Sequence, residues 1–236
     1  MRLDTALPGR FLRSESPRAA CDDCSMGASE DLFESASAEL AERHPEIGRL
    51  YEAVGPCVLT PPQDDEFTAL ARAIVFQQLT GKAARTIWGR VVAVLDGTPE
   101  PHKVASTTEE ALRAAGLSRN KAMSIRDLAA KAIDGSVPLS GFDELSDEEI
   151  VTRLSEVRGI GVWTAEMFLI FQLRRLDVWP IGDLGVRKGY ARAFALPGVP
   201  APKELEVMGE RFRPFRTIAA WYCWRAVETI TPGQLS

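Results

Sequence analysis

The sequence predicts an all-α protein, and three observations point to this fold class. From Ser29 onward, apolar residues recur with the i, i+3, i+4, i+7 spacing of one helix face in almost every segment. Two expected helix starts place a hydroxyl three residues before a carboxylate, which is the spacing of a capping box. Alternating strand patterns are scarce, and Cys57-Val58-Leu59 is the clearest of them.

The expected helices follow one another with short connections. The apolar spacing gives helices over residues 31–43, 47–54, 67–78, 83–95, 121–133, 162–173, 184–194, 203–211 and 215–229. Thr80-Gly81 separates the third helix from the fourth, and Asp134-Gly135 ends the helix that starts at Lys121. Two more helices should begin near Thr108 and Asp147, because residues 107–110 (TTEE) and 146–149 (SDEE) carry the capping boxes.

Composition and charge narrow the class of protein. The chain has 236 residues, of which 45% are hydrophobic and 26% are charged, as in ordinary globular proteins. It has no apolar run of about 18 residues, so we expect no membrane span, and no secretory h-region at the N-terminus. Four cysteines in a chain of this length do not form a disulfide framework, so we expect a cytoplasmic protein.

The distribution of charge leaves room for a polyanionic partner. The net charge is −5, but the acidic excess lies within residues 1–66, and the remaining residues carry a net positive charge. A nucleic-acid face is therefore allowed on the larger part of the chain. Residues 1–28 interleave Pro, Gly, Ser and Arg with no apolar period, and we expect them to be a disordered leader.

The most informative segment is a tight turn between two expected helices. Gly159-Ile160-Gly161 follows a helix that ends near Val157 and precedes one that starts at Val162. Paired glycines allow positive φ and a close approach of the backbone, and the N–H groups at the start of the next helix suit a phosphate. A plain αα-hairpin turn has the same pattern, so the glycines alone leave both interpretations open.

Four blocks together are more specific than this turn. In chain order they are residues 73–81 (AIVFQQLTG), 157–165 (VRGIGVWTA), 180–187 (PIGDLGVR) and 213–225 (RPFRTIAAWYCWR). In this order the chain resembles the helix-hairpin-helix DNA glycosylases, specifically the 3-methyladenine DNA glycosylase II branch, over roughly residues 30–232. The resemblance implies two helical lobes flanking a cleft, in a domain over residues 29–232 with a central lobe over about 64–180.

The resemblance implies that Asp183 is the catalytic aspartate. An aspartate just before a helix that starts at Leu184 is also an ordinary N-cap, and the two roles are compatible. Because bifunctional relatives carry a lysine nucleophile where this chain has Trp163, we expect hydrolysis to an abasic site without a lyase step.

The resemblance also implies roles for residues around the aspartate. Trp163, Met167, Phe215 and Gln77 would form the base pocket, and Phe215 stands where the family more often has Trp. Leu79 and Gln78 would be the wedge that fills the gap left by an extruded base. Phosphate contacts would come from Gly159, Gly161, Val162, Thr164 and Lys121. On packing grounds alone, Trp163, Met167 and Leu79 would be ordinary core residues, and we expect Trp224 to be one.

No cofactor is expected to be required. The resemblance implies a Na⁺ or K⁺ ion held at the hairpin by the backbone carbonyls of Ser155, Val157 and Ile160. Cys21 and Cys24 have metal-ligand spacing but no second pair, and the last third of the chain has only Cys223. An iron–sulfur cluster on four cysteines, as in some relatives, is therefore not expected.

The leading hypothesis is a monofunctional DNA glycosylase that removes alkylated bases such as 3-methyladenine from double-stranded DNA and acts as a monomer. A helix-hairpin-helix protein that binds DNA without catalysis is the alternative, and Asp183 separates the two because a scaffold does not need an acid there. A helical protein–protein adaptor is a third interpretation, supported only by the acidic first quarter of the chain. The sequence leaves the range of lesions open.

Overall fold

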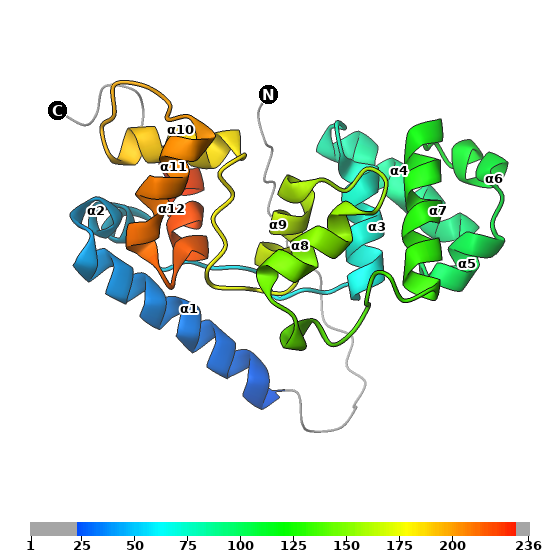
Figure 1. The fold of residues 1–236 in the computed structure, drawn as a ribbon, viewed down its shortest axis with the longest axis horizontal. Coiled ribbons are helices and arrows are strands. Elements are labelled where there is room, and N and C mark those ends of the chain that lie inside the picture. The colour runs from blue at the N-terminus through cyan, green and yellow to red at the C-terminus, as the bar shows by residue number, and fades with distance from the viewer. Residues whose placement is uncertain (1–22, 230–236) are drawn as a thin grey trace, which may run out of the picture.

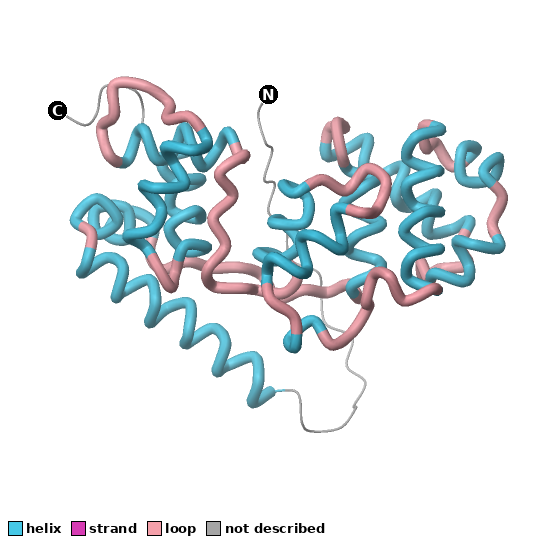
Figure 2. The backbone as a smooth tube through the Cα atoms, viewed as in Figure 1, coloured by secondary structure: helices cyan, strands magenta, loops and turns pink. Residues whose placement is uncertain are grey.

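The computed structural model describes residues 23–229, and within them every regular element is a helix (Figure 2). The α-helices are α1 (Asp23–Arg43), α2 (Pro45–Val54), α3 (Glu66–Phe76), α4 (Gly81–Val94), α5 (Pro101–Ser106), α6 (Glu109–Ala114), α7 (Arg119–Ile133), α8 (Asp147–Ser155), α9 (Val162–Phe171), α10 (Leu184–Ala193), α11 (Pro202–Gly209) and α12 (Arg216–Thr229). Two 3₁₀ turns, η1 (Phe142–Glu144) and η2 (Glu210–Phe212), complete the described part. The expected all-α class is confirmed.

Both segments expected to carry capping boxes lie at helix starts, but the reciprocal pair forms only in the second of them. The Thr108 side chain accepts a hydrogen bond from the N–H of Ala111 and begins α6. Ser146 accepts from the N–H of Glu149, whose side chain accepts from the N–H of Ser146, so α8 has the complete reciprocal pair. These two ends are set by local chemistry, which is why the sequence alone located them.

Three details of the structure differ from what the sequence patterns indicated. The alternating segment Cys57-Val58-Leu59 is not a strand: Val58 is 70% exposed between two buried neighbours, but the segment has no partner strand. Helix α1 begins at Asp23, inside the expected leader of residues 1–28, whose first 22 residues lie outside the described part. The six-residue helix α5 was not expected at all, because it is too short for a period to be visible.

The helices form two lobes, which lie side by side in Figure 1. The central lobe contains α3 to α9, and the terminal lobe contains α1, α2 and α10 to α12. Two non-helical segments, residues 55–65 and 172–183, cross between the lobes. They are tied to each other, because the side chain of Gln172 donates to the carbonyl of Asp64 at 2.8 Å.

Helix α12 lies at the centre of the terminal lobe and fixes the position of α10. Ile218, Tyr222 and Cys223 are buried along it. A Cβ atom at Gly189 of α10 would lie 1.8 Å from the carbonyl oxygen of Cys223, so only glycine allows this close approach of the two helices. The start of α10 is therefore held against α12.

No described helix is both long enough and apolar enough to cross a membrane.

Candidate active site

The carboxylate of Asp183 lies where the two lobes meet. Asp183 is the N-cap of α10, and its Oδ1 accepts a hydrogen bond from the N–H of Val186 at 2.8 Å. The same oxygen accepts from the indole Nε1 of Trp224, on α12, at 3.0 Å. The other oxygen, Oδ2, accepts from the indole Nε1 of Trp163, on α9, at 2.7 Å. Three neutral N–H donors thus hold the carboxylate in one orientation.

No positive group neutralises this carboxylate. Within residues 23–229, no Lys, Arg or His forms an ion pair with Asp183, although the same lobe contains a dense ion-pair network between Asp177, Glu210, Arg213 and Arg216. Asp183 is half-buried, so it can be reached from solvent. Asp183 therefore caps α10 and still presents a negative charge that no cation neutralises. The sequence analysis expected these two roles to be compatible.

Aromatic rings surround Asp183. The Trp163 side chain is 47% exposed, which is unusual for a large ring whose N–H already has a hydrogen-bond partner in the protein. Phe171, at the other end of α9, stacks on Trp224 with ring centroids 5.7 Å apart. Electron-rich faces beside a negative charge suit a ligand that is flat and cationic.

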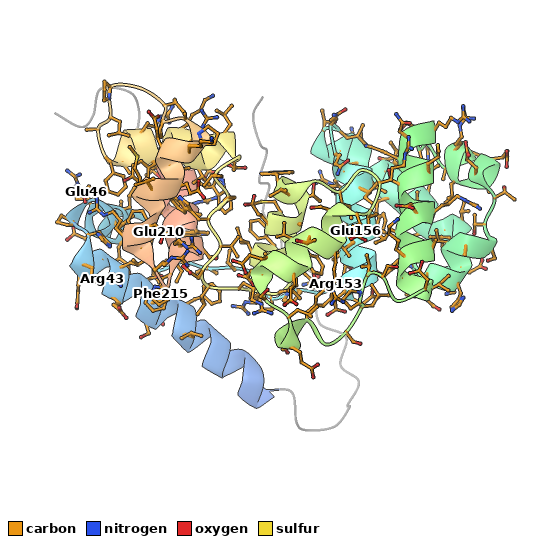
Figure 3. All side chains as sticks on the ribbon, in the orientation of Figure 1. Arg43, Glu46, Arg153, Glu156, Glu210 and Phe215 are labelled. Carbon is orange, nitrogen blue, oxygen red and sulfur yellow. The ribbon has the colours of Figure 1, made fainter. Side chains whose placement is uncertain are left out.

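The other expected pocket residues do not all lie beside Asp183. Met167 lies one turn after Trp163 and packs partly buried against the core. Phe215 precedes the start of α12, and eight residues of helix between Arg216 and Trp224 span roughly 12 Å. Figure 3 shows Phe215 at the end of the terminal lobe where α12 begins. The structure therefore does not bring Phe215 beside Asp183, and Trp224, which we expected to be a core residue, is there instead.

Glu166 is a group at this site that the sequence analysis did not identify. It is half-buried on α9, one helical turn after Trp163. Burial, and the nearby negative charge of Asp183, raise the pKa of Glu166 to about 7. The signal in the sequence was a single acidic residue in an otherwise apolar helix, residues 162–171 (VWTAEMFLIF).

The glycine turn between α8 and α9 is a helix-hairpin-helix, and it is fixed by contacts with α7. Gly159 has φ of 81°, and a Cβ atom there would lie 2.6 Å from the hydroxyl of Ser124, so glycine is needed for two reasons. The N–H of Arg158 donates to Oδ2 of Asp127 at 2.7 Å. The guanidinium of Arg158 donates to the side chain of Asn120 at 3.2 Å.

The start of α9 has the properties of an anion site. Gly161 is its N-cap and offers no side chain, so the first N–H groups of the helix have no capping partner. Val162 is 56% exposed, whereas the side chain of Thr164 is buried. Of the expected phosphate contacts in this turn, Gly161 and Val162 are accessible, and Thr164 offers its backbone N–H rather than its hydroxyl.

Lys121 and Gln77 hold the turn that follows α3 against the hairpin. The ammonium of Lys121 donates to the carbonyls of Val75 at 2.7 Å and Gln77 at 2.6 Å, and burial lowers its pKa. The side-chain amide of Gln77 donates to the carbonyl of Gly159 at 2.9 Å. These contacts differ from the expected phosphate contact for Lys121 and the expected pocket position for Gln77, since both side chains are engaged within the protein.

The two expected wedge residues are not equivalent in the structure. Gln78 has φ of 57°, in the left-handed region, and its side chain is exposed. Leu79 is half-buried, and its N–H donates to the carbonyl of Phe76 at 3.3 Å. A non-glycine residue held in this conformation at the tip of a turn is typical of a functional position. Gln78 is therefore better placed than Leu79 to project from the surface.

The hairpin residues expected to hold a monovalent cation include an unsatisfied group. The Ser155 hydroxyl oxygen is buried with no hydrogen-bond partner in the described part of the chain. The Val157 carbonyl accepts from the N–H of Ile160 at 3.0 Å, which leaves one lone pair free. Within residues 23–229, no group of three His, Cys, Asp or Glu side chains could hold a metal ion, and Cys21 lies outside this range.

Comparisons with known proteins agree on one family. The family model described as "HhH-GPD superfamily base excision DNA repair protein" matches residues 71–214. The chain is 39% identical over 164 residues to DNA-3-methyladenine glycosylase 1 of Schizosaccharomyces pombe, which covers 68% of this chain and 72% of that protein.

Two solved structures are similar over most of the chain. One is a 3-methyladenine DNA glycosylase of Schizosaccharomyces pombe in complex with abasic DNA, with TM-score 0.71 and 36% identity, covering 81% of this chain and 95% of that one. The other is a DNA-3-methyladenine glycosidase from Bacillus halodurans, with TM-score 0.75 and 32% identity, covering 83% of this chain and 89% of that one.

Proposed function

Because the chain belongs to the HhH-GPD superfamily of base excision DNA repair proteins, we propose that it is a monofunctional glycosylase for alkylated bases in DNA. It hydrolyses the N-glycosidic bond of bases such as 3-methyladenine and leaves an abasic site. The names of the relatives support this substrate class, and the abasic DNA in the complex of the similar structure supports DNA as the partner.

The observation that carries the proposal is the unneutralised carboxylate of Asp183. An N-alkylated purine is already cationic and leaves readily, so the barrier lies in the positive charge that develops at C1′ of the sugar. A carboxylate oriented by fixed N–H donors stabilises that charge without having to reorganise. Asp183 also orients the water that attacks C1′, and one oxygen, Oδ2, has only a single protein donor.

The aromatic rings recognise the base. Trp163 is exposed at the site, so a flipped cationic base meets its electron-rich face, while Trp224 is stacked on Phe171. Each cation–π contact contributes about 0.5–2 kcal/mol. Since Trp163 stands where bifunctional relatives carry their lysine nucleophile, no Schiff base forms and the reaction ends at the abasic site.

DNA is held by the hairpin and opened by the neighbouring turn. The N–H groups at the start of α9 bind a backbone phosphate, and Gln78 enters the base stack from the turn after α3. Gln77 and Lys121 keep these two elements at a fixed separation through their contacts with Gly159 and the end of α3. One copy of the chain supplies all of these parts, which supports action as a monomer.

We infer that the hairpin also holds a Na⁺ or K⁺ ion. The free lone pair of the Val157 carbonyl and the unsatisfied Ser155 hydroxyl are oxygen donors of the kind that such ions bind. A bound ion there would add positive charge next to the phosphate site, and the reaction at Asp183 does not require it.

The test is the release of free bases from methylated duplex DNA by the purified full chain. We expect 3-methyladenine in the supernatant, and abasic sites that become strand breaks only after alkali treatment. A chain that binds duplex DNA in a salt-dependent manner but releases no base from any alkylated duplex would be a scaffold, and the proposal would be wrong.

A further inference from the structure

Lys121, in the first turn of α7, makes an unusual set of contacts for a lysine. Its ammonium donates to the carbonyls of Val75 and Gln77, at the end of the neighbouring helix α3 (Figure 1). The side chain is half-buried, yet no Asp or Glu within residues 23–229 forms an ion pair with it. The dipole of α7 also disfavours a cation in its first turn. The charge of Lys121 therefore serves α3 rather than α7.

The carbonyls that Lys121 binds are ones that α3 cannot satisfy by itself. The carbonyls at the C-terminal end of a helix have no donor from within the helix, and the negative end of the helix dipole attracts a cation. The carbonyl of Phe76, between the two, accepts from the N–H of Leu79 at 3.3 Å. The end of α3 is thus completed by one backbone donor and by a side chain from α7.

The contact with Gln77 acts directly on the conformation of Gln78. The carbonyl of Gln77 belongs to the planar peptide group that precedes Gln78, so a donor that fixes this carbonyl fixes one side of the φ torsion of Gln78. That torsion is 57°, in the left-handed region that L residues other than glycine disfavour. Lys121 therefore restrains the peptide group on which the unusual conformation of Gln78 depends.

Another left-handed residue at a helix end is held in a different way. Ala195 follows α10 with φ of 49°, and the N–H of the next residue, Leu196, donates back to the carbonyl of Ala191 at 2.9 Å. A backbone bond of this kind, five residues back, is the usual closure of a helix that ends in a left-handed residue. The N–H after Gln78 makes no such bond within the described chain. The ammonium of Lys121 occupies the end of α3 instead.

We propose that Lys121 is a positioning residue for base extrusion: it holds Gln78 in the left-handed conformation, so that the wedge is in place before DNA binds. This inference rests on the proposed glycosylase function, with Gln78 as the residue that enters the base stack. A turn that is already ordered does not lose conformational freedom when the base leaves the stack. Without the ammonium, the backbone of Gln78 relaxes toward the commoner regions and its side chain leaves the productive direction.

The test uses the full chain and a DNA strand whose only adenine carries 3-methyladenine. In one duplex thymine faces the lesion, and in the other a tetrahydrofuran abasic analogue faces it, so that the base is unpaired and costs less to extrude. Base release is followed in single turnovers with saturating enzyme, which removes differences in DNA affinity.

The test variant is Lys121→Met, which keeps the length of the side chain but has no donor. The matched control is Lys103→Met on α5, because Lys103 is also half-buried and its ammonium also donates to a carbonyl, that of Thr98 at 3.3 Å. Both variants lose one positive charge, so the charge alone does not distinguish them.

We expect Lys121→Met to slow release about tenfold when thymine faces the lesion, and by less than about threefold when the analogue does, because an unpaired base needs the wedge less. Lys103→Met should change neither rate. Since Lys121 acts through Gln78, the double variant Gln78→Ala/Lys121→Met should release the thymine-paired lesion no more slowly than Lys121→Met alone.

Equal slowing on both duplexes, or none, would overturn the inference, and so would losses that multiply in the double variant. Urea unfolding verifies that each variant is folded. If Lys121→Met does not fold, Lys121→Gln takes its place with the same expectations, because its side chain is polar but too short to reach both carbonyls. A wild type that releases the base from neither duplex would instead contradict the proposed function itself.

Discussion

The indole Nε1 of Trp163 lies 2.7 Å from Oδ2 of Asp183 and joins the two lobes at the reacting group. Trp163 belongs to the central lobe, whereas Asp183 begins a helix of the terminal lobe. Because Trp224 binds the other oxygen from within the terminal lobe, the orientation of the carboxylate depends on how both lobes are placed. The catalytic geometry is therefore a property of the junction between the lobes.

The first prediction concerns the donor on Trp163. Trp163→Phe keeps an aromatic face but removes the N–H, so the carboxylate loses its donor on Oδ2. A hydrogen bond to a charged group contributes about 1.5–3 kcal/mol, and we expect kcat/KM for release of alkylated bases to fall about ten- to a hundredfold. Trp88→Phe, on α4 and away from Asp183, is the control and should leave kcat/KM unchanged. Equal activity of the two variants would contradict the role of this donor.

The second prediction compares the two glycines of the hairpin. Gly159→Ala forces a side chain into a conformation with φ of 81° and against the Ser124 hydroxyl, so it should lower the free energy of unfolding by about 1–2 kcal/mol or more. At Gly161 an added Cβ atom meets nothing within 4 Å, and Gly161→Ala should cost less than about 1 kcal/mol. Urea denaturation measures both, and the reverse order would show that the hairpin geometry described here is wrong.

The third prediction separates the two candidates for the wedge. Gln78 is exposed, so Gln78→Ala should leave the free energy of unfolding within about 0.5 kcal/mol of the wild type. It should slow base release about tenfold, because the gap left by the flipped base is no longer filled and unstacking costs a few kcal/mol. Leu79→Ala should instead reduce stability by more than about 1 kcal/mol, since Leu79 is half-buried. Single-turnover rates and urea denaturation on both variants decide between them.

The fourth prediction is the pH dependence of stability. The pKa of Glu166 is raised in the folded chain from 4.5 to about 7, so between these values the folded state holds a proton that the unfolded state has lost. The ionised form is therefore a cost to the folded state, and the free energy of unfolding falls as the pH rises through this window. Glu166→Gln removes the cost, so its stability relative to the wild type should increase from pH 5 to pH 8. Parallel stability curves for the two proteins would contradict the position assigned to Glu166.

The sequence alone predicted the helices whose ends or faces are set locally. The N-caps Thr108 and Ser146 lie where helix starts were expected, and the reciprocal pair of a capping box forms at Ser146. The segment Cys57-Val58-Leu59 shows the limit of this approach: its alternation reflects one side packed on the core, and the same pattern without a partner strand gives an irregular segment. Whether a partner exists is decided by the tertiary structure.

The site was predictable only in part, because its residues come from helices that are far apart along the chain. The glycine turn was found from its own pattern, Asp183 and Trp163 were found through the resemblance to a family, and the structure brings Trp163 and Asp183 into contact. Trp224 rather than Phe215 contacts Asp183, because the packing of α10 on α12 decides which part of α12 faces Asp183. No local pattern encodes that packing.

The central claim is that the charge of Asp183 drives cleavage of the glycosidic bond. The direct measurement is the single-turnover rate of base release from methylated duplex DNA by Asp183→Asn, together with its affinity for DNA that contains an abasic site. We predict that release falls at least about a hundredfold, because the oriented negative charge is lost while the shape is kept, and that the affinity for abasic DNA remains. Release by Asp183→Asn within a few-fold of the wild-type rate would contradict the account.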